Sequence, residues 1–150
     1  MNNRERDKLD IVSTDSVILE DSPVIEVEPE QLELSHGGGL SVIIKHDYYA
    51  NDTAHGRDLF RAFLTALDSR KADIVRILVA GSGVKLFSDN NTLYKEFKEL
   101  YSDVPVVTVC LESIEEYGID ISALPSNCET LDMGEFAAAV INTQNPVVLE

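Results

Sequence analysis

The apolar run VPVVTV at residues 104–109 constrains the fold of this chain more than any other stretch. Apart from Thr108, every residue in it is apolar. A strand with one solvent-facing side alternates apolar and polar residues, whereas a strand covered on both sides is apolar throughout. The run is therefore typical of an inner strand of a parallel sheet that is covered on both faces.

Strand and helix patterns alternate around this run, from residue 40 to the last residue. The strand patterns are LSVIIKHD, ADIVRILVA and PVVLE, at residues 40–47, 72–80 and 146–150. The clearest helix pattern, at residues 52–70, has leucine and phenylalanine at helical spacing and Asp52 or Thr53 as a candidate N-cap. Further helix patterns cover residues 89–103, 111–117 and 133–142. Repeated βα units predict one α/β domain with a mostly parallel sheet of about five strands, helices on both faces and right-handed crossovers.

The first 38 residues differ in composition from the rest and are predicted to form an acidic N-terminal arm. They carry ten of the 27 acidic residues, and the segments SVILE and PVIEVEPEQLEL alternate apolar with acidic positions. This alternation is typical of half-buried strands, so a hairpin, an arm on a partner subunit and a partly disordered tail all stay open. The glycines of SHGGGL predict a joint, which places the compact domain at residues 39–150.

The charge of the chain excludes two classes of partner. Lysine and arginine number 12 against 27 acidic residues, a formal net charge of −15, which argues against a nucleic acid or an anionic membrane as partner. There is no apolar run of about 18 residues, and the first ten residues are polar where a signal peptide is apolar. We therefore expect a cytoplasmic protein whose two cysteines, Cys110 and Cys128, are reduced.

The loops that leave the strands are where a ligand site is expected, because open α/β sheets bind ligands at the carboxyl ends of their strands. In AGSGVKLF, backbone N–H groups at Gly81, Ser82 and Gly83 are candidates to cradle an anion, and Lys85 is the nearby cation. The segment lacks the dinucleotide fingerprint and the P-loop spacing, so a plain tight turn with a solvated lysine stays open as the alternative.

His46 lies at the end of the first strand pattern, beside Asp47, and is a candidate proton partner for a thiol at the same edge. A histidine that only caps or packs is the alternative. The chain contains no CxxC or HxxxH spacing, so we expect no metal site and no cofactor.

Cys110 lies where the apolar run meets a helix pattern. A thiol in the first turn of a helix is favoured as thiolate, which predicts a reactive sulfur, whereas a buried cysteine would act as a small apolar residue. Of the acidic residues that follow, we expect Glu112 and Glu116 to share a solvent face, with Ser113 turned to the sulfur. Cys128 follows polar residues in a loop or short strand, has no activating neighbour and is predicted to be structural or incidental.

Four segments occur in an order that resembles a known family. They are GRDLFRAFLTAL, ILVAGSGVKL, VTVCLESIEEYGI and DMGEF, and they resemble the first helix, the NSGVKL turn, the CGTCLEYYGL segment and the NMYE motif of the DsrE/DsrF-like sulfur-relay family. The resemblance runs from about Leu40 to Val140. It is greatest to the C-terminal domain of YedF-type proteins of selenium and sulfur metabolism.

This resemblance implies a flavodoxin-like three-layer sandwich, a homo-oligomer of three or more subunits, and sulfurtransferase-like sulfur relay. Cys110 would hold the sulfur as a persulfide, received from a donor protein and passed to an acceptor protein. The chain departs from the family pattern at three places. Gly81 stands where asparagine is usual, Ser113 replaces the second cysteine, and the acidic segment stands where a sulfur-carrier domain with a CPxP motif is expected.

Two other functions stay open on the sequence. In the first, the same fold is a non-catalytic module that binds a small ligand or a protein, and Cys110 only packs. In the second, the acidic arm docks a basic partner protein.

Overall fold

The protein, as a computed structural model, is described over residues 38–150. The predicted acidic arm lies outside the described residues apart from Gly38, so its structure and its boundary stay predictions. The strands are β2 (Leu40–Ile44), β3 (Ile74–Val79), β4 (Val106–Cys110), β5 (Cys128–Leu131) and β6 (Pro146–Leu149). The α-helices are α2 (Ala54–Asp68), α3 (Tyr94–Tyr101), α4 (Leu111–Glu116) and α5 (Met133–Ile141). Short 3-10 helices are η2 (Lys71–Asp73), η3 (Gly81–Phe87) and η4 (Ile121–Ala123).

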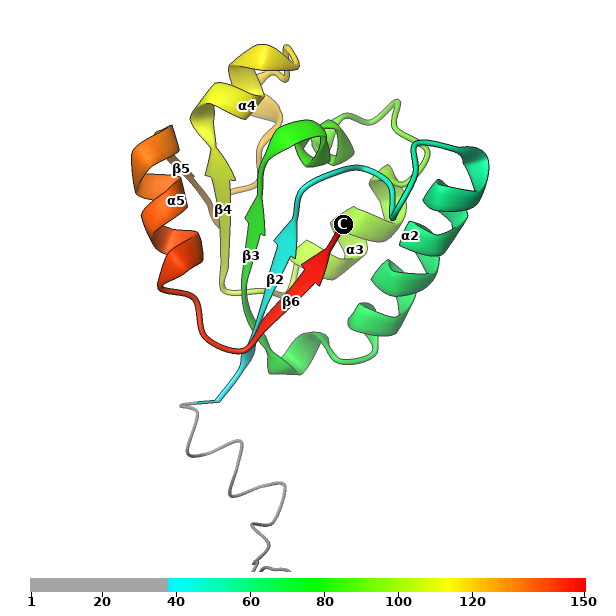
Figure 1. Ribbon diagram of the computed structural model, residues 1–150, viewed down its shortest axis with the longest axis horizontal. Helices are drawn as coiled ribbons and strands as arrows, with labels where there is room; N and C mark the ends of the chain where they lie inside the picture. Colours follow the sequence, from blue (N-terminus) through cyan, green and yellow to red (C-terminus); the bar gives the residue numbers. More distant parts are fainter. Residues whose placement is uncertain (1–37) are drawn as a thin grey trace, which may run out of the picture. The chain divides into compact units, whose positions relative to one another are not determined.

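The five strands form one parallel sheet in the order β5-β4-β3-β2-β6 (Figure 1). The apolar run therefore contributes an inner strand, β4, as predicted, and Val107 and Val109 are fully buried in it. The predicted α/β fold with a flavodoxin-like three-layer sandwich is confirmed. Its strand order, with β6 beside β2, differs from the order 2-1-3-4-5 of flavodoxin itself.

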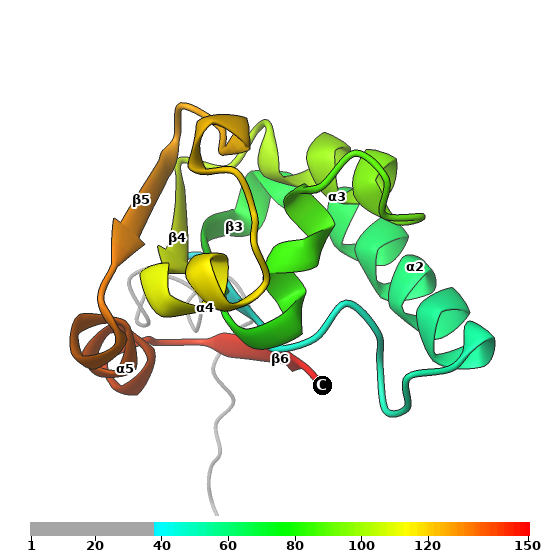
Figure 2. The same cartoon turned by 90° about the horizontal axis from the view of Figure 1, so that it is seen from above.

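The path of the chain decides which helices cover which face of the sheet. From β2 to β5 each strand lies beside the one before it, and the helices of these crossovers pack on one face. The connection from β5 to β6 returns across the whole sheet. Crossovers between parallel strands are right-handed. Because the connection from β5 to β6 crosses the sheet in the opposite direction from the earlier ones, its helix α5 lies on the opposite face from α2 and α3 (Figures 1 and 2).

The two faces of the sheet are covered unequally. The larger core lies on the side of α2 and α3 and includes Phe60 and Phe97. Among residues 38–150, the buried cluster under α5 consists of Ile43, Leu78, Cys110 and Phe136, with Ala80, Leu131, Ala139 and Val140 partly buried against it. In this range the face under α5 therefore has fewer buried apolar side chains than the opposite face.

The structure decides the length or the type of several elements that the sequence leaves approximate. The turn after β3 is the 3-10 helix η3, and the helix expected at residues 89–103 is the shorter α3. Of the loop and the short strand left open for the residues around Cys128, the structure has the strand, β5. Of the two candidate N-caps of α2, Thr53 is the one that caps, since its Oγ1 accepts the Gly56 N–H at 3.0 Å.

A pair of glycine substitutions tests this packing. A Cβ built on Gly56, in the first turn of α2, would lie 1.8 Å from the Asn51 carbonyl oxygen, so Gly56→Ala is expected to destabilise the fold by about 1–3 kcal/mol. Gly134 holds a similar place in α5, but its nearest atom would be Asp132 Oδ1 at 3.5 Å. Gly134→Ala is therefore expected to be neutral or to stabilise by up to about 1 kcal/mol. Chemical denaturation measures both, and equal effects would contradict the close approach at Gly56.

Candidate functional site

The carboxyl ends of β2, β3 and β4 bring the three predicted loops together. The Gly81 N–H after β3 donates to Ser113 Oγ in α4 at 2.9 Å. His46 after β2 lies with its Nδ1 3.4 Å from Ser82 Oγ in η3. Two pairs of predicted site residues are thus in contact, although each pair is separated by more than 30 residues in the sequence.

The backbone at Gly81 explains why glycine occupies this position. Its φ is +58°, and a Cβ there would lie 2.7 Å from the Lys45 carbonyl oxygen, so a side chain would meet both strain and a clash. The N–H groups of Gly81 and Gly83 are already engaged, with Ser113 Oγ and with the Ala80 carbonyl. Neither is therefore free to bind an anion in this conformation.

Cys110 ends β4 and is the N-cap residue of α4. Its side chain points toward α5 and is 5% exposed, in one cluster with Ile43, Leu78 and Phe136. The thiol donates to Glu112 Oε1, with 3.7 Å between sulfur and oxygen. The sulfur therefore lies under the first turns of α5 and beside one carboxylate.

The orientation expected in α4 was wrong for Glu112 and Ser113, whereas Glu116 is exposed as expected. Glu112 faces the sulfur instead of solvent, and the Ser113 hydroxyl is bonded to Gly81. The physical reason is the Gly81 N–H, a partly buried donor that needs an acceptor and finds it in Ser113. The helix rotation that satisfies this bond leaves Glu112 on the side of Cys110.

Lys85 lies at a second part of this edge, in a pocket of about 360 Å³. Its ammonium is 3.9 Å from Asp47 Oδ2 and 5.6 Å from the ring centre of Tyr117. Asp47 is only 8% exposed and also accepts from Asn91 Nδ2 at 3.1 Å. Lys85 is thus paired with a carboxylate rather than held ready for an anionic sulfur.

The candidate residues drawn from the sequence did not include Asn91 and Tyr117. Asp47 directly follows the candidate His46 at a strand end and shares its position at this edge. Asn91 accepts the Leu93 N–H two residues further on, a local bond typical of asparagine in turns, but its bond to Asp47 forms only in the folded protein.

The second thiol, Cys128, is half-buried in β5. Burial, and next the charge of Glu129, raise the pKa of Cys128 to about 11. At neutral pH this sulfur is therefore a thiol and a poor nucleophile.

Over residues 38–150, His, Cys, Asp and Glu side chains nowhere gather in groups of three or more that could hold a metal ion. None of the helices described is both long and apolar enough to cross a membrane.

Comparisons with known proteins give the fold of the chain. No protein-family model and no curated protein matches it. Among solved structures, MTH1491 from Methanobacterium thermoautotrophicum, a protein of unknown function, matches with a TM-score of 0.52 and 11% identity, over 74% of this chain and 98% of that one. The ychN protein from E. coli matches with a TM-score of 0.52 and 16% identity, over 74% and 99%. BT1422 from Bacteroides thetaiotaomicron, a conserved protein of unknown function, gives 0.51 and 16%, over 77% and 98%. At these identities the likeness establishes a shared fold.

The hydrogen bond between Ser113 and Gly81 can be tested by stability. Ser113→Ala removes the acceptor of a partly buried N–H, so the free energy of unfolding is expected to fall by about 1 kcal/mol. Ser122→Ala is the matched control, because the Ser122 hydroxyl bonds only the exposed Asp120, and it is expected to change stability by less than about 0.5 kcal/mol. Urea unfolding measures both. A Ser113→Ala effect no larger than the control would contradict a structural role for this bond.

The raised pKa of Cys128 can be tested by alkylation of the Cys110→Ser variant, in which Cys128 is the only thiol. Because only the thiolate reacts, its labelling rate is expected to keep rising to a pH of about 11 instead of levelling near the ordinary value of 9.0. By linkage, the folded state gains stability from this group below its ordinary pKa and loses that gain as the pH rises through about 11. The same variant unfolded in urea is the control, and an equal pH profile in both states would contradict the effect of burial.

Proposed function

We propose that this protein is a DsrE-like sulfur-relay protein that holds a persulfide on Cys110 and passes the sulfur to a partner protein. The observation that carries this proposal is the position of Cys110 at the carboxyl end of β4. The helix after β4 buries Ile114 in the larger core, whereas the helix after β5 lies on the other face. Adjacent strands whose connections diverge in this way form the crevice where open α/β sheets bind ligands.

The transfer requires no change in net oxidation state. The Cys110 thiolate attacks the outer sulfur of a donor persulfide, a new S–S bond forms on Cys110, and the donor leaves as a thiolate. The thiol proton has an acceptor in Glu112, whose carboxylate oxygen is 3.7 Å from the sulfur. An acceptor thiolate then attacks the outer sulfur and releases Cys110 in its starting state.

Ser113 determines how the sulfur can leave. A second thiol at this position could displace the sulfur by forming an internal disulfide, which a hydroxyl cannot do. The Ser113 hydroxyl is moreover engaged with Gly81. The outer sulfur therefore has to be taken by a thiol of another protein.

Access to Cys110 depends on α5. The thiol is covered by Phe136, and the cluster around it is small, while Met133 in the same turn is 61% exposed. A donor therefore reaches the sulfur only when the first turns of α5 move away. We expect this opening to limit the rate of loading.

Persulfide loading is tested with the Cys128→Ser variant and a small-molecule persulfide donor. Mass spectrometry is expected to find one added sulfur atom on Cys110, removable by a reducing agent. Phe136→Ala is expected to raise the loading rate roughly tenfold or more, because it removes the cover of the thiol, whereas Ile141→Ala, at a position 81% exposed on the same helix, is expected to leave the rate unchanged.

The contrary results are equally specific. If Cys110 gains no sulfur in either the Cys128→Ser background or its Phe136→Ala derivative, the sulfur-relay proposal fails. If loading occurs but is equal in the Phe136→Ala and Ile141→Ala variants, the proposed role of α5 fails.

A second candidate function rests on the burial of Cys110. In it, the protein is a non-catalytic binding module, Cys110 is a packed residue, and the ligand occupies the pocket of about 360 Å³ beside Asp47 and Lys85. Alkylation of the Cys128→Ser variant separates the two functions. Slow labelling that follows global unfolding, unchanged by Phe136→Ala, favours the binding module.

We also propose the setting in which the protein works. A cytoplasmic homo-oligomer of three or more subunits, with separate donor and acceptor proteins, suits the resemblance and keeps the thiols reduced. The acidic arm is proposed as a docking segment for a basic partner. Size measurement in solution, and partner capture with and without residues 1–35, test these two statements.

A further inference from the structure

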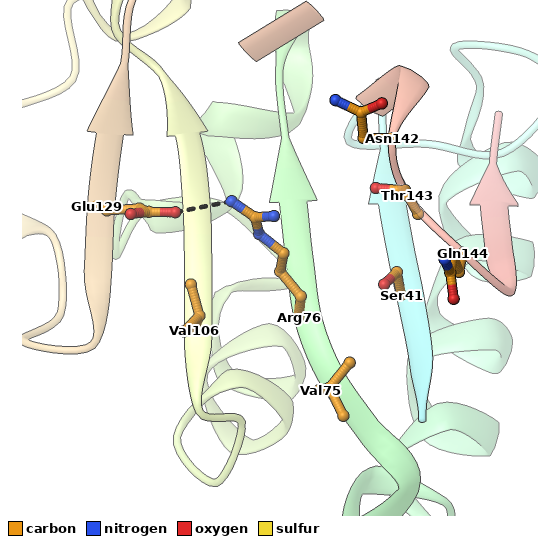
Figure 3. A pocket seen from close by; sticks show the side chains of 8 residues that line it. All are labelled: Ser41, Val75, Arg76, Val106, Glu129, Asn142, Thr143 and Gln144. Atoms are coloured by element: carbon orange, nitrogen blue, oxygen red, sulfur yellow. Dashed lines mark hydrogen bonds and ion pairs between the residues drawn. The ribbon is translucent and has the colours of Figure 1, made fainter. Parts of the chain in front are cut away.

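A separate pocket of about 380 Å³ lies on the α5 face of the sheet, among residues that the candidate site does not use (Figure 3). Its floor is formed by Ser41 of β2, Arg76 of β3 and Val106 of β4. Glu129 of β5 stands on one side, and the segment 142–144 between α5 and β6 stands on the other. The segment that follows α5 on its way back to β6 thus lines one side of the pocket.

A charge pair lies inside this pocket. One terminal nitrogen of Arg76 is 2.8 Å from Glu129 Oε2, and Arg76 Nε donates to Thr108 Oγ1 at 2.9 Å. The Thr108 hydroxyl in turn donates to Glu129 Oε2 at 2.8 Å. Thr108, and after it Arg76, hold the pKa of Glu129 below its ordinary value, so the carboxylate is ionised at neutral pH.

The charge pair keeps one donor and one acceptor open to the pocket. The second terminal nitrogen of Arg76 and the Oε1 oxygen of Glu129 make no hydrogen bond within residues 38–150, and the two side chains are partly exposed, at 32% and 46%. Ser41, which is 6% exposed, lines the pocket, and Asn142 and Gln144 line it from exposed positions. A ligand that enters the pocket therefore meets a free N–H and a free carboxylate oxygen side by side.

We propose that this pocket binds a free α-amino acid as a zwitterion. The ligand carboxylate pairs with the unengaged nitrogen of Arg76, and the ammonium pairs with Oε1 of Glu129, while the bond between Arg76 and Glu129 is kept. Asn142, Gln144 and Ser41 supply further donors to the carboxylate and polar contacts to the side chain. The site's cation and anion are adjacent, as they are in an α-amino acid, so the two pairs complement each other.

Charge excludes the simpler ligands. The chain carries −15 overall, so a plain anion is repelled as it approaches, and a plain cation meets Arg76. An apolar ligand would find mainly polar groups, since the apolar lining is limited to Val75 and Val106. A neutral molecule with both charges is attracted by both members of the pair.

The test is an amide NMR titration of the full chain with each of the common L-α-amino acids at fixed ionic strength. For an amino acid that binds, saturable shifts are expected at Ser41, Arg76 and residues 142–144. Its N-acetyl derivative lacks the ammonium and its amide lacks the carboxylate, so each is expected to bind at least about tenfold more weakly. If no amino acid gives saturable shifts at these residues, or if both derivatives bind as well as the amino acid, the proposal is overturned.

Variants of the protein test the same two charge pairs from the side of the pocket. Glu129→Gln keeps the shape of the side chain and removes the anion, so it is expected to bind the amino acid at least about tenfold more weakly and the N-acetyl derivative more tightly than the wild type does. Glu99→Gln, at an exposed position of α3, removes the same charge elsewhere and is expected to change neither affinity. Ser41→Ala, which leaves the charge pair intact, is expected to weaken binding several-fold. Unchanged affinity in both Glu129→Gln and Ser41→Ala overturns the assignment of the site.

Discussion

A parallel sheet has to be covered on both faces, and among residues 38–150 one helix, α5, covers one of them. The crossovers from β2 to β5 all run in one direction, so right-handedness assigns their helices to the other face. Among the described connections, the return to β6 is the one that reaches the α5 face. Helix α5 has nine residues and covers only part of that face. It covers Cys110, whereas the Arg76–Glu129 pocket lies beyond its end.

The position of Cys110 combines two properties that are usually separate. It stands at the carboxyl end of an inner strand, where α/β sheets place their ligands, and it is packed beneath Phe136 as an apolar residue would be. The sulfur-relay function proposed for Cys110 requires that this cover be weakly held. A cluster of four buried residues costs far less to open than the larger core on the other face.

The limited length of α5 also explains the polar residues on this face. On β4, Val107 and Val109 point to the larger core, whereas Thr108 and Cys110 point to the α5 side. Helix α5 covers Cys110, but Thr108 lies beyond the helix and needs polar partners. It finds them in Arg76 and Glu129, from the strands on either side of β4. A single buried hydroxyl in an apolar strand is thus satisfied by two residues far from it in the sequence.

The sequence by itself determined the class of the fold and the order of its elements, because apolar periodicity and capping residues act over a few neighbouring positions. The apolar run identified an inner strand, and the leaving loops identified the edge where Gly81 and Ser113 meet. Only the tertiary structure decided which face of β4 the thiol occupies and which neighbour it has. Glu112 rather than Ser113 faces the sulfur, because the Gly81 N–H fixes the rotation of α4. The same is true of Lys85, which is paired with Asp47, and of Arg76, which is paired with Glu129 across an intervening strand. These pairings depend on strand order and register, which arise from long-range burial and are not encoded in any local stretch.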